Sequence, residues 1–461
     1  MRLIEHIIFT EIENGKNLMI NSINGLIDKV DIHSYEIIAK WKECEMIVPD
    51  GETETVLYNN LKSRGYLVSS RKEENQEKEK VLQSLRNKHA KVKANRSNLT
   101  FVMTYDCNFR CSYCFEDAGV FSNVESDSKG SQRERNKKSV ITPELIDAAF
   151  GLVGDELKTV GIFGGEPLLP STKGAFSYIA SKAPDKSYKI ITNGYYIEEF
   201  SDILTKINIS QIMVTIDGEE ETHNSRRCLP NGKPTYKKIM SGIIMCLKNG
   251  IPVCIRMNLD ETNFSEVSDL KLRLIDELSA YKGLLSFEAS PMIKAAADER
   301  NQMFLELYKD GVMYPIKEMK IRNRMLGKFT PIVNAITTGT TLRPLYSFCH
   351  AHNSGLLVDP YGKIFPCLLA VGIDGLAIGS YYPQIRFYEN SIRHRNIDAI
   401  PECRRCKYSL LCGGGCPVAI SDHSDIFKPE CFTVLNEIHN VMPLFFVEKE
   451  KTYKMLNNDR E

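Results

Sequence analysis

The sequence predicts an α/β protein built around a partial (β/α)6 barrel, with a small winged-helix-like unit before the barrel and a cysteine-rich domain after it. The 461 residues exceed what one hydrophobic core usually holds. Between residues 99 and 340, short apolar runs alternate with helical segments, which indicates a parallel sheet. Ten of the 14 cysteines fall into two groups, one at the start of this region and one after it.

Residues 1–70 are expected to form the winged-helix-like unit. Two extended runs, Ile7–Phe9 and Leu18–Ile20, are joined through a glycine turn and are typical of a strand pair. Apolar positions at helical spacing follow at residues 32–41 and 53–61, before a last extended run. Strands, helices and a closing strand in this order favour a winged helix.

The rest of the chain divides by composition. Residues 71–98 are rich in Lys, Glu, Arg, Asn and Gln and have too few apolar residues for a core, so we expect a charged linker. The six strands of the barrel are predicted at residues 100–104, 159–163, 189–192, 211–216, 253–258 and 284–289. Residues 341–433 form the cysteine-rich domain, and residues 434–461 a C-terminal helix and tail.

Composition excludes several classes of function. Lys plus Arg and Asp plus Glu both number 59, so no global charge argues for a nucleic-acid partner. The longest apolar stretch near the C-terminus, Val441–Val447, is too short to span a membrane, and the first residues lack a signal-peptide pattern. Cysteines in such a chain favour metal binding over disulfides. We therefore expect a cytoplasmic protein in a reduced compartment, without a membrane partner.

The first cysteine group follows the first predicted strand, at Cys107-x3-Cys111-x2-Cys114, with the aromatic Tyr113 before the third thiol. This spacing lets three thiolates bind one iron-sulfur cluster from a single loop and leaves the fourth iron open to a small molecule. A zinc site or three unrelated core cysteines are the alternatives. Zinc normally takes four ligands, and this is not a usual zinc spacing.

Polar motifs stand at the ends of the following strands. In Gly164-Gly165-Glu166-Pro167, the glycines let the backbone pass close to a ligand, and carboxylate or carbonyl oxygens can accept from an ammonium group. The guanidinium of Arg256 suits a carboxylate, and an ordinary ion pair is its alternative. Further candidates are Thr192, Asn193, Thr215 and Asp217 at strand ends, and His223, Arg226 and Arg227 in a polar loop, where solvation alone is an equal alternative.

The second cysteine group reads Cys349-x12-Gly362-x4-Cys367, then Cys403-x2-Cys406-x5-Cys412-x3-Cys416, then Cys431. The paired thiols alone could also form a four-thiolate zinc site. The four other cysteines, Cys44, Cys228, Cys246 and Cys254, have no partner spacing. Of these, only Cys228 lies in a polar loop, and it is a candidate further ligand or acid.

Together these motifs resemble the radical S-adenosylmethionine (radical SAM) superfamily, over residues 99–431. The resemblance implies a catalytic 4Fe-4S cluster on Cys107, Cys111 and Cys114, which binds SAM and cleaves it to a 5'-deoxyadenosyl radical. It also implies that Arg256 binds the SAM carboxylate. The remaining SAM contacts that it implies are Tyr113, Gly164, Gly165, Glu166, Pro167, Thr192, Asn193, Thr215 and Asp217.

The seven later cysteines resemble the SPASM extension of radical SAM peptide- and protein-modifying enzymes, which holds two auxiliary 4Fe-4S clusters. The resemblance assigns the outer cluster to Cys403, Cys406, Cys412 and Cys431, and the inner cluster to Cys349, Cys367 and Cys416. Several relatives have a further cysteine just before the first of these. No cysteine lies between residues 254 and 349 here, so the inner cluster is expected to keep an open iron that can bind a substrate thiolate.

The N-terminal unit resembles the peptide-recognition domain of ribosomal-peptide maturases, which binds a leader peptide by adding it to a sheet edge. We therefore expect an enzyme that installs a cysteine thioether crosslink in a ribosomally made precursor peptide. Its electron donor would be a low-potential protein such as flavodoxin or ferredoxin. Winged helices also bind nucleic acid, but no basic cluster marks the predicted helices.

Other activities remain open at this point. Carbon-carbon crosslinking, epimerisation and oxidation of a sulfatase residue use the same kind of enzyme, although the extra N-terminal unit disfavours the last. A redox carrier without turnover is the alternative from a different class. Gly164 to Pro167 argue against it, because an electron carrier needs no site for the SAM amine.

Overall fold

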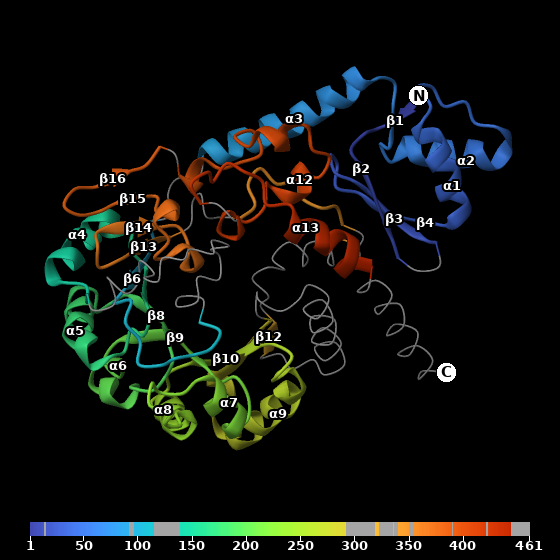
Figure 1. Ribbon diagram of the computed structural model, residues 1–461. Helices are drawn as coiled ribbons and strands as arrows, with labels where there is room; N and C mark the ends of the chain where they lie inside the picture. Colours follow the sequence, from blue (N-terminus) through green and yellow to red (C-terminus); the bar gives the residue numbers. More distant parts are fainter. Residues whose placement is uncertain are drawn as a thin grey trace, which may run out of the picture.

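The computed structural model of the protein describes residues 1–12, 15–91, 96–114, 139–291, 319–321, 335, 340–349, 355–389, 391–420 and 423–443. The barrel forms one side of the molecule, the N-terminal unit lies at one end, and the C-terminal region lies along the barrel between them (Figure 1). Within these ranges, no helix has both the length and the apolar character that crossing a bilayer requires.

An eleven-stranded sheet forms the centre of the molecule, in the order β12-β11-β10-β9-β8-β7-β6-β13-β14-β15-β16. Six parallel strands follow one another in chain order: β6 (Asn98–Val102), β7 (Thr159–Phe163), β8 (Ser187–Thr192), β9 (Asn208–Thr215), β10 (Val253–Leu259) and β11 (Leu285–Pro291). The predicted partial barrel of six βα repeats is therefore confirmed. β12 (Met319–Ile321) joins the β11 edge, and β13 (Leu356–Val358) joins the β6 edge, both in parallel.

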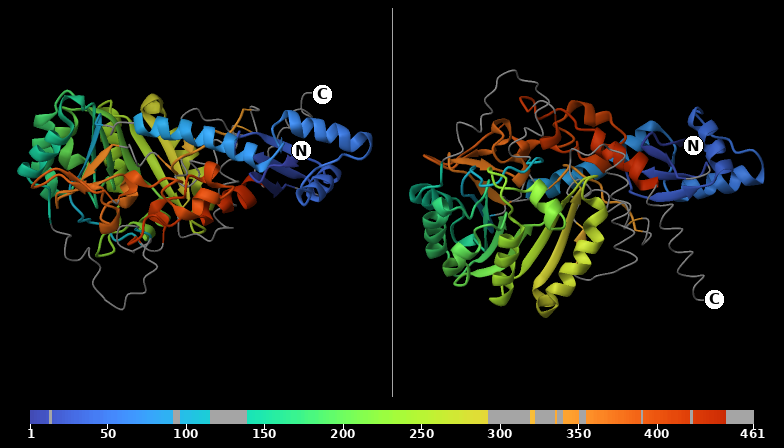
Figure 2. Two further views of the ribbon diagram at one scale, coloured as in Figure 1. Left: turned by 90° about the horizontal axis from the view of Figure 1, so that it is seen from above. Right: turned by 60° about the horizontal axis from the view of Figure 1, so that its bottom comes forward.

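Helices cover the outer face of the curved sheet, as both views in Figure 2 show. They are α4 (Pro143–Val153), α5 (Lys173–Lys182), α6 (Ser201–Leu204), α8 (Tyr236–Lys248) and α9 (Val267–Glu277), with the short α7 (Glu220–Arg226) following β9. Most residues of β7 and β10 are buried, which explains the nearly continuous apolar sequences of these strands. Because parallel strands share one carboxyl edge, the loops after β6 to β10 converge at that edge.

The N-terminal unit contains the predicted elements and two additional short strands, one at residues 2–3 and one at residues 27–30. β2 (Ile7–Glu11), β3 (Asn17–Asn21) and β4 (Ile27–Val30) form an antiparallel sheet, while β1 (Arg2–Leu3) pairs with β5 (Leu67–Val68). The helices α1 (Ile32–Lys42) and α2 (Gly51–Ser63) pack on this framework around a core that includes Trp41 and Tyr66. The added strand β4 is one edge of the three-stranded sheet.

The segment expected to be a linker contains the 21-residue helix α3 (Arg71–Lys91), which packs at both ends. Near its start, Glu74 is buried against the N-terminal unit and accepts hydrogen bonds from the backbone and ring of His6. Further along, Leu82 is buried in a cluster with Cys403, and Arg86 pairs with Asp398 over 2.7 Å. Helix α3 therefore connects the N-terminal unit directly to the cysteine-rich region.

The C-terminal region extends the central sheet with antiparallel strands: β14 (Lys363–Phe365), β15 (Gly379–Ser380) and β16 (Arg386–Phe387). The short helices α12 (Ser409–Cys412) and α13 (Phe432–Asn436) follow. The N-terminal sheet packs on this part of the chain, since Ile8 and Ile20 share a buried cluster with Cys412 and Val434. Residues 444–461 of the expected C-terminal helix and tail lie outside the described residues.

Candidate functional site

The first cysteine group lies on the loop that leaves β6. Burial raises the pKa of the Cys107 thiol, and negative charge on Glu166, Cys111 and Cys114 raises it further, so these groups lie near one another. The backbone N–H of Phe109 donates to Cys107 Sγ over 3.4 Å. The structure thus brings the predicted trio together beside the end of β7.

Gly164 and Gly165 are required by the close passage of two backbones. A Cβ atom at Gly165 would lie 2.4 Å from the carbonyl oxygen of Asp106, and one at Gly164 would lie 2.4 Å from that of Thr104. The backbone N–H of Gly165 donates to the Thr104 carbonyl over 2.9 Å. These contacts hold the Gly-Gly-Glu-Pro stretch directly against the residues that precede Cys107. The two motifs form one structural unit.

Glu166 is a buried link between strand ends. Its carboxylate accepts hydrogen bonds from the Thr192 hydroxyl and the Asn193 backbone N–H, each over 2.6 Å, and from the Leu168 N–H over 2.8 Å. Burial raises its pKa to about 7, although these donors and Arg227 favour the charged form. Both carboxylate oxygens are therefore engaged within the protein. Glu166 therefore fixes the neighbouring backbone at the ends of β7 and β8.

Asn193 carries this network to the cysteine loop. Its side-chain amide donates to Asn108 Oδ1 over 2.8 Å and lies 3.9 Å from Cys107 Sγ. The predicted residues Thr192 and Asn193 are thus brought together with Glu166 and Cys107. They connect the ends of β7 and β8 to the first cysteine.

Tyr113 joins the cysteine loop to the end of β9. Its hydroxyl contacts the Asp217 carboxylate and accepts a hydrogen bond from Arg227 Nη1 over 2.5 Å. Asp217 Oδ1 also accepts from the Asn258 backbone N–H over 2.9 Å, and the Arg226 guanidinium lies over the Tyr113 ring. Arg226 and Arg227, for which solvation in a polar loop was an equal alternative, are both buried in this network. This network connects the first cysteine loop to the ends of β9 and β10.

Arg256 lies at the middle of β10, next to Thr215 of β9 in the sheet register. Its Nη1 is 3.4 Å from the Glu288 carboxylate, and its Nε donates to Asn258 Oδ1 over 3.0 Å. Glu288 is buried on the neighbouring strand β11. The guanidinium proposed for the SAM carboxylate is therefore held by two side chains. Glu288 is a site residue that the sequence analysis missed.

Cys228 also borders this site. Its carbonyl oxygen accepts a hydrogen bond from the Arg110 backbone N–H over 3.1 Å, which ties it to the first cysteine loop. Burial raises the pKa of the Cys111 thiol, and charge on Cys228 contributes to the same direction. Cys228, which has no partner spacing and was expected in a polar loop, therefore lies beside the first cysteine group.

The later cysteines separate into two neighbourhoods. Burial raises the pKa of the Cys416 thiol to about 12, and charges on Cys349 and Cys367 contribute. Cys416 and Cys367 pack against the same core as Cys107 and Cys111. This neighbourhood contains the three cysteines that the sequence assigns to the inner group.

The expected outer group lies toward helix α3. Burial raises the pKa of the Cys403 thiol to about 11, and charges on Cys406 and Cys431 add to this shift. Cys403 packs in the cluster that contains Leu82 of α3, and Cys412 packs under the N-terminal sheet. Cys431 is exposed, so this neighbourhood reaches the surface.

Three successive glycines allow the later cysteine loops to meet. Gly413, Gly414 and Gly415 all have positive φ angles. A Cβ atom at Gly413 would lie 2.5 Å from the backbone of Phe348, next to Cys349, and one at Gly415 would lie 1.8 Å from the Glu430 carbonyl oxygen, next to Cys431. Only glycine permits this approach together with the left-handed conformation.

The donor set suits iron-sulfur clusters. No disulfide joins any of the fourteen cysteines, all of which the structure describes. Asn108 Nδ2 and Arg227 Nε are buried donors without a partner in the described ranges, and both border the first cysteine loop. No three His, Cys, Asp or Glu side chains of the described residues converge as single-ion ligands do, whereas in a 4Fe-4S cluster each thiolate binds a separate iron.

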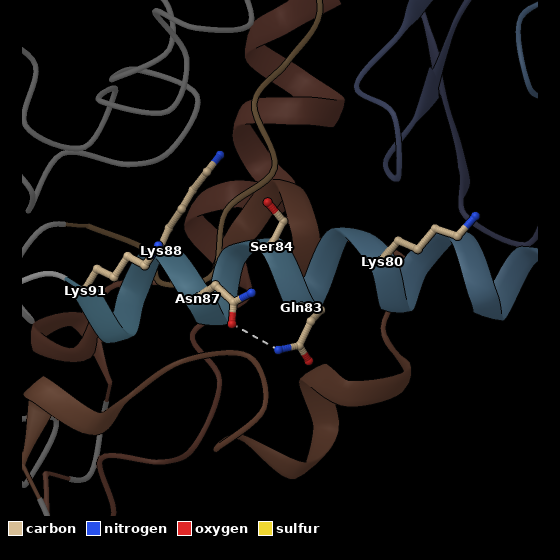
Figure 3. A pocket seen from close by; sticks show the side chains of 6 residues that line it. All are labelled: Lys80, Gln83, Ser84, Asn87, Lys88 and Lys91. Carbon is tan, nitrogen blue, oxygen red and sulfur yellow. Dashed lines mark hydrogen bonds between the residues drawn. The ribbon is translucent and has the colours of Figure 1, made fainter.

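A surface hollow of about 540 Å³ lies elsewhere, along one face of α3. Figure 3 shows its lining of polar side chains from this single helix: Lys80, Gln83, Ser84, Asn87, Lys88 and Lys91. No predicted site residue lines it. It is a feature of the helix surface, separate from the cysteine sites.

A family model described as the radical SAM superfamily matches residues 101–271. This part of the chain is a radical SAM domain. The matched range contains the cysteine trio and the Gly-Gly-Glu-Pro motif, and it ends in α9. The protein is accordingly a radical SAM enzyme.

Three curated relatives show how far the similarity extends. The radical SAM cyclopropyl synthase TigE of Paramaledivibacter caminithermalis is 22% identical, over 87% of this chain and 86% of its own. A cysteine-type anaerobic sulfatase-maturating enzyme of Clostridium perfringens is 22% identical over 67% of this chain and 85% of its own. The sporulation killing factor maturation protein SkfB of Bacillus subtilis is 26% identical over 48% of this chain and 49% of its own.

Solved structures agree with the radical SAM fold. The enzyme anSMEcpe with bound AdoMet superposes with a TM-score of 0.54 at 16% identity, covering 78% of this chain and 95% of that one. Streptococcus suis SuiB bound to the precursor peptide SuiA gives a TM-score of 0.51 at 16% identity, covering 94% of this chain and 99% of that one. A match that omits only 6% of 461 residues must include more than half of the N-terminal unit.

Proposed function

We propose that this radical SAM enzyme installs a thioether crosslink from a cysteine in a ribosomally synthesised precursor peptide. The peptide substrate is supported by the N-terminal unit, which packs on the cysteine-rich region. It is also supported by the similarity, across 94% of the chain, to SuiB, a protein seen with its precursor peptide. The names of TigE and SkfB refer to a synthase and a maturation protein, in line with this class.

In the proposed reaction, residues of this chain hold the SAM-binding cluster, hold the auxiliary clusters and fix the loops around the cofactor. The cysteines of the first loop would hold the SAM-binding 4Fe-4S cluster, and the two later groups would hold the auxiliary clusters. When bound, the first cluster supplies the electron that cleaves SAM to a 5'-deoxyadenosyl radical. Glu166, Thr192 and Asn193 fix the strand ends around the cofactor, and Tyr113 and Arg227 close the loop against β9.

The crosslink requires a balanced loss of two hydrogens. One hydrogen atom of the partner residue passes to the radical, the cysteine thiol loses its proton, and one electron returns to the protein's iron-sulfur groups as the carbon–sulfur bond forms. The inner group, Cys349, Cys367 and Cys416, supports this role because it provides three thiols, two of which, Cys367 and Cys416, pack against the same hydrophobic core as Cys107 and Cys111. A fourth iron would remain for the substrate thiolate.

Leader binding is proposed at the β4 edge of the N-terminal sheet, which pairs with no further strand among the described residues. β4 is an edge strand, whereas the opposite edge, β2, contacts the residues after α13, where the Thr10 hydroxyl donates to the Ile438 carbonyl. An extended peptide can add to an exposed edge through backbone hydrogen bonds. The β4 edge is therefore the better placed of the two.

Epimerisation is a second candidate, favoured by the position of Cys228 beside Cys111. In that reaction the substrate carbon gives a hydrogen atom to the 5'-deoxyadenosyl radical and receives one from a thiol on the opposite face. The resulting sulfur radical must then be reduced by the external electron donor and take up a proton. Sulfatase maturation is also compatible with the similarity to the sulfatase-maturating enzymes.

Mass spectrometry of the anaerobic reaction separates these activities. The reconstituted enzyme is incubated with SAM, a reductant and a cysteine-containing precursor peptide encoded beside its gene. A loss of about two daltons per modified cysteine, with that thiol no longer alkylatable, supports the crosslink. In deuterated water, an unchanged thiol and incorporation of one deuterium would instead indicate epimerisation, and replacement of sulfur by oxygen would indicate sulfatase-type oxidation. Either result would overturn the thioether proposal.

A further inference from the structure

Arg395 lies between the two later cysteine groups. It follows the short helical turn Ile392–His394, and only 4% of its surface is exposed. Burial lowers the pKa of its guanidinium, while negative charge on Cys416, Cys403, Cys412 and Cys349 acts in the opposite direction. The first and last of these thiols belong to the inner neighbourhood, and the other two belong to the outer one. A single guanidinium is therefore close to both.

The same guanidinium ties together the loops that carry these cysteines. Nη1 donates to the Gly415 carbonyl and Nη2 to the Gly414 carbonyl, each over 2.6 Å. Nε donates to the Ile426 carbonyl over 2.6 Å, and Nη2 donates to the Lys428 carbonyl over 2.8 Å. The first pair precedes Cys416, and the second pair precedes Cys431. One side chain thus fixes both loops through four hydrogen bonds.

The charge of Arg395 needs a partner. Among the described residues, no carboxylate lies within ion-pair distance of it, and its hydrogen bonds all go to neutral carbonyl groups. A buried cation without a counter-charge is costly. Iron-sulfur clusters held by thiolates carry net negative charge, and nearby charge is one of the factors that set their reduction potentials. Two such clusters on either side would compensate this guanidinium.

We propose that Arg395 is a positioning residue shared by the two auxiliary cysteine groups, which fixes their loops and supplies a positive charge to both clusters. This inference rests on the proposed cofactor content. Loss of the Arg395 side chain should affect both auxiliary clusters together and leave the SAM-binding cluster in place. A residue that only stabilised the fold would have no reason to act selectively on these two sites.

The test compares Arg395→Gln, which removes the charge, with Arg395→Lys, which retains the charge but not the forked geometry. Arg393→Gln is the matched control. Arg393 lies two residues before Arg395, and its guanidinium stacks over the Phe387 ring at 4.8 Å. Each protein is reconstituted anaerobically, its iron and sulfide are counted, and its clusters are titrated by electron paramagnetic resonance. SAM is added to identify the signal of the Cys107 site.

We expect about twelve irons per chain in the unmodified protein and in Arg393→Gln, corresponding to three clusters. Arg395→Gln should fall toward about four irons while keeping the SAM-sensitive signal, and any auxiliary cluster that it retains should titrate at a lower potential. Arg395→Lys should lie between the two. If Arg395→Gln fails to fold, Arg395→Lys decides alone and must still load fewer auxiliary irons than the unmodified protein.

Several results would overturn the inference. Arg395→Gln with unchanged iron and unchanged potentials would remove any role at the clusters, and loss of one auxiliary cluster alone would contradict a shared role. If Arg395→Lys had the same iron content and cluster potentials as Arg395→Gln, the positive charge would have no role. Only about four irons in the unmodified protein would overturn the proposed auxiliary clusters as well, which distinguishes that failure from a failure of Arg395 itself.

Discussion

Arg227 donates a hydrogen bond from Nη1 to the hydroxyl oxygen of Tyr113 over 2.5 Å, and this contact secures the cysteine loop to the segment after β9. The same hydroxyl contacts Asp217. A tyrosine within the cysteine motif thus bridges a buried cation and a buried carboxylate. The loop that holds the proposed SAM-binding cluster is fixed by side chains as well as by its thiols.

Replacing Tyr113 by Phe should weaken SAM binding by roughly tenfold, or about 1.4 kcal/mol, because two buried charged groups lose a common partner. Equilibrium binding of SAM to the reconstituted enzyme measures this effect. Tyr178→Phe is the control, since that hydroxyl bonds to Asp147 on the exposed side of the barrel. Equal affinities in both variants would contradict a role for the hydroxyl.

Gly165→Ala should abolish SAM binding, because the added methyl group would lie 2.4 Å from the Asp106 carbonyl oxygen beside Cys107. Backbone must move to relieve this clash, and the cysteine loop would move with it. The measurement is the change that SAM causes in the cluster's paramagnetic resonance spectrum. Gly174→Ala, where a Cβ atom meets nothing within 4 Å, should retain the change. A normal response from Gly165→Ala would refute the packing argument.

Cysteine substitutions should separate SAM cleavage from product formation. Cys107→Ala should abolish 5'-deoxyadenosine production, because the proposed SAM-binding cluster loses a ligand. Cys367→Ala should retain part of that production but form no crosslinked peptide. Liquid chromatography of both products tests this difference, with the exposed Cys44→Ala as control. Crosslinked product from both variants would show that the cluster assignment is wrong.

Glu74 should make the N-terminal unit sensitive to acid. Burial raises the pKa of its carboxyl, but hydrogen bonds from His6 and Arg71 outweigh burial and lower it from 4.5 to about 2. A carboxylate with a lowered pKa stabilises the fold above its unfolded pKa, and this contribution is lost as the pH falls from about 4.5 to about 2. Stability should therefore decrease across that window.

Glu74→Gln should lower the free energy of unfolding of this unit by about 3 kcal/mol at neutral pH, because it leaves His6 and Arg71 without their buried partner. The variant should also lose most of the acid dependence. Urea unfolding followed by fluorescence is selective for this unit, since Trp41 is the single tryptophan of the chain and is buried there. Glu77→Gln, an exposed change on the same helix, should resemble the unmodified protein.

Leader binding at β4 predicts a local change in hydrogen exchange. Backbone amides of Ile27–Val30 should exchange more slowly when the precursor peptide is present, because an added strand would pair with their outward groups. Mass spectrometry after deuterium labelling measures this. Amides of Ile7–Glu11, whose outer edge is already in contact with the C-terminal region, serve as the internal control. Protection at those residues alone would place the peptide elsewhere.

The barrel was predictable because its chemistry lies close to strand ends. β7 occupies the predicted range, and β10 begins at the predicted residue, since buried parallel strands leave continuous apolar runs. β4 escaped prediction because its four residues include two charged ones, Asp28 and Lys29. Antiparallel pairing with the neighbouring strand β3, and not an apolar run of its own, makes this segment a strand.

Helix α3 and Arg395 show a different limit. The sequence of α3 is so polar that a solvated linker is the natural expectation, yet Glu74 and Leu82 are both buried. Glu74 is buried against His6 of the N-terminal unit, and Leu82 is buried against residues near Cys403, more than 300 positions later. Arg395 has no motif around it, and its four carbonyl acceptors come from two separate segments, residues 414–415 and residues 426–428. A single sequence contains no signal for such a convergence.

Helix α3 also gives the molecule a fixed internal length. Twelve positions of the helix separate Glu74, which contacts the N-terminal unit, from Arg86, which pairs with Asp398, so the two contacts lie about 18 Å apart along the helix axis. An extended peptide covers such a length with about five residues. If one end of a precursor is held on the N-terminal unit, the helix sets a nearly constant distance to the reacting residues. The enzyme would then modify the residue that lies a fixed number of positions from the leader. Shortening or lengthening the peptide segment between the leader and that residue would therefore move the modification along the peptide.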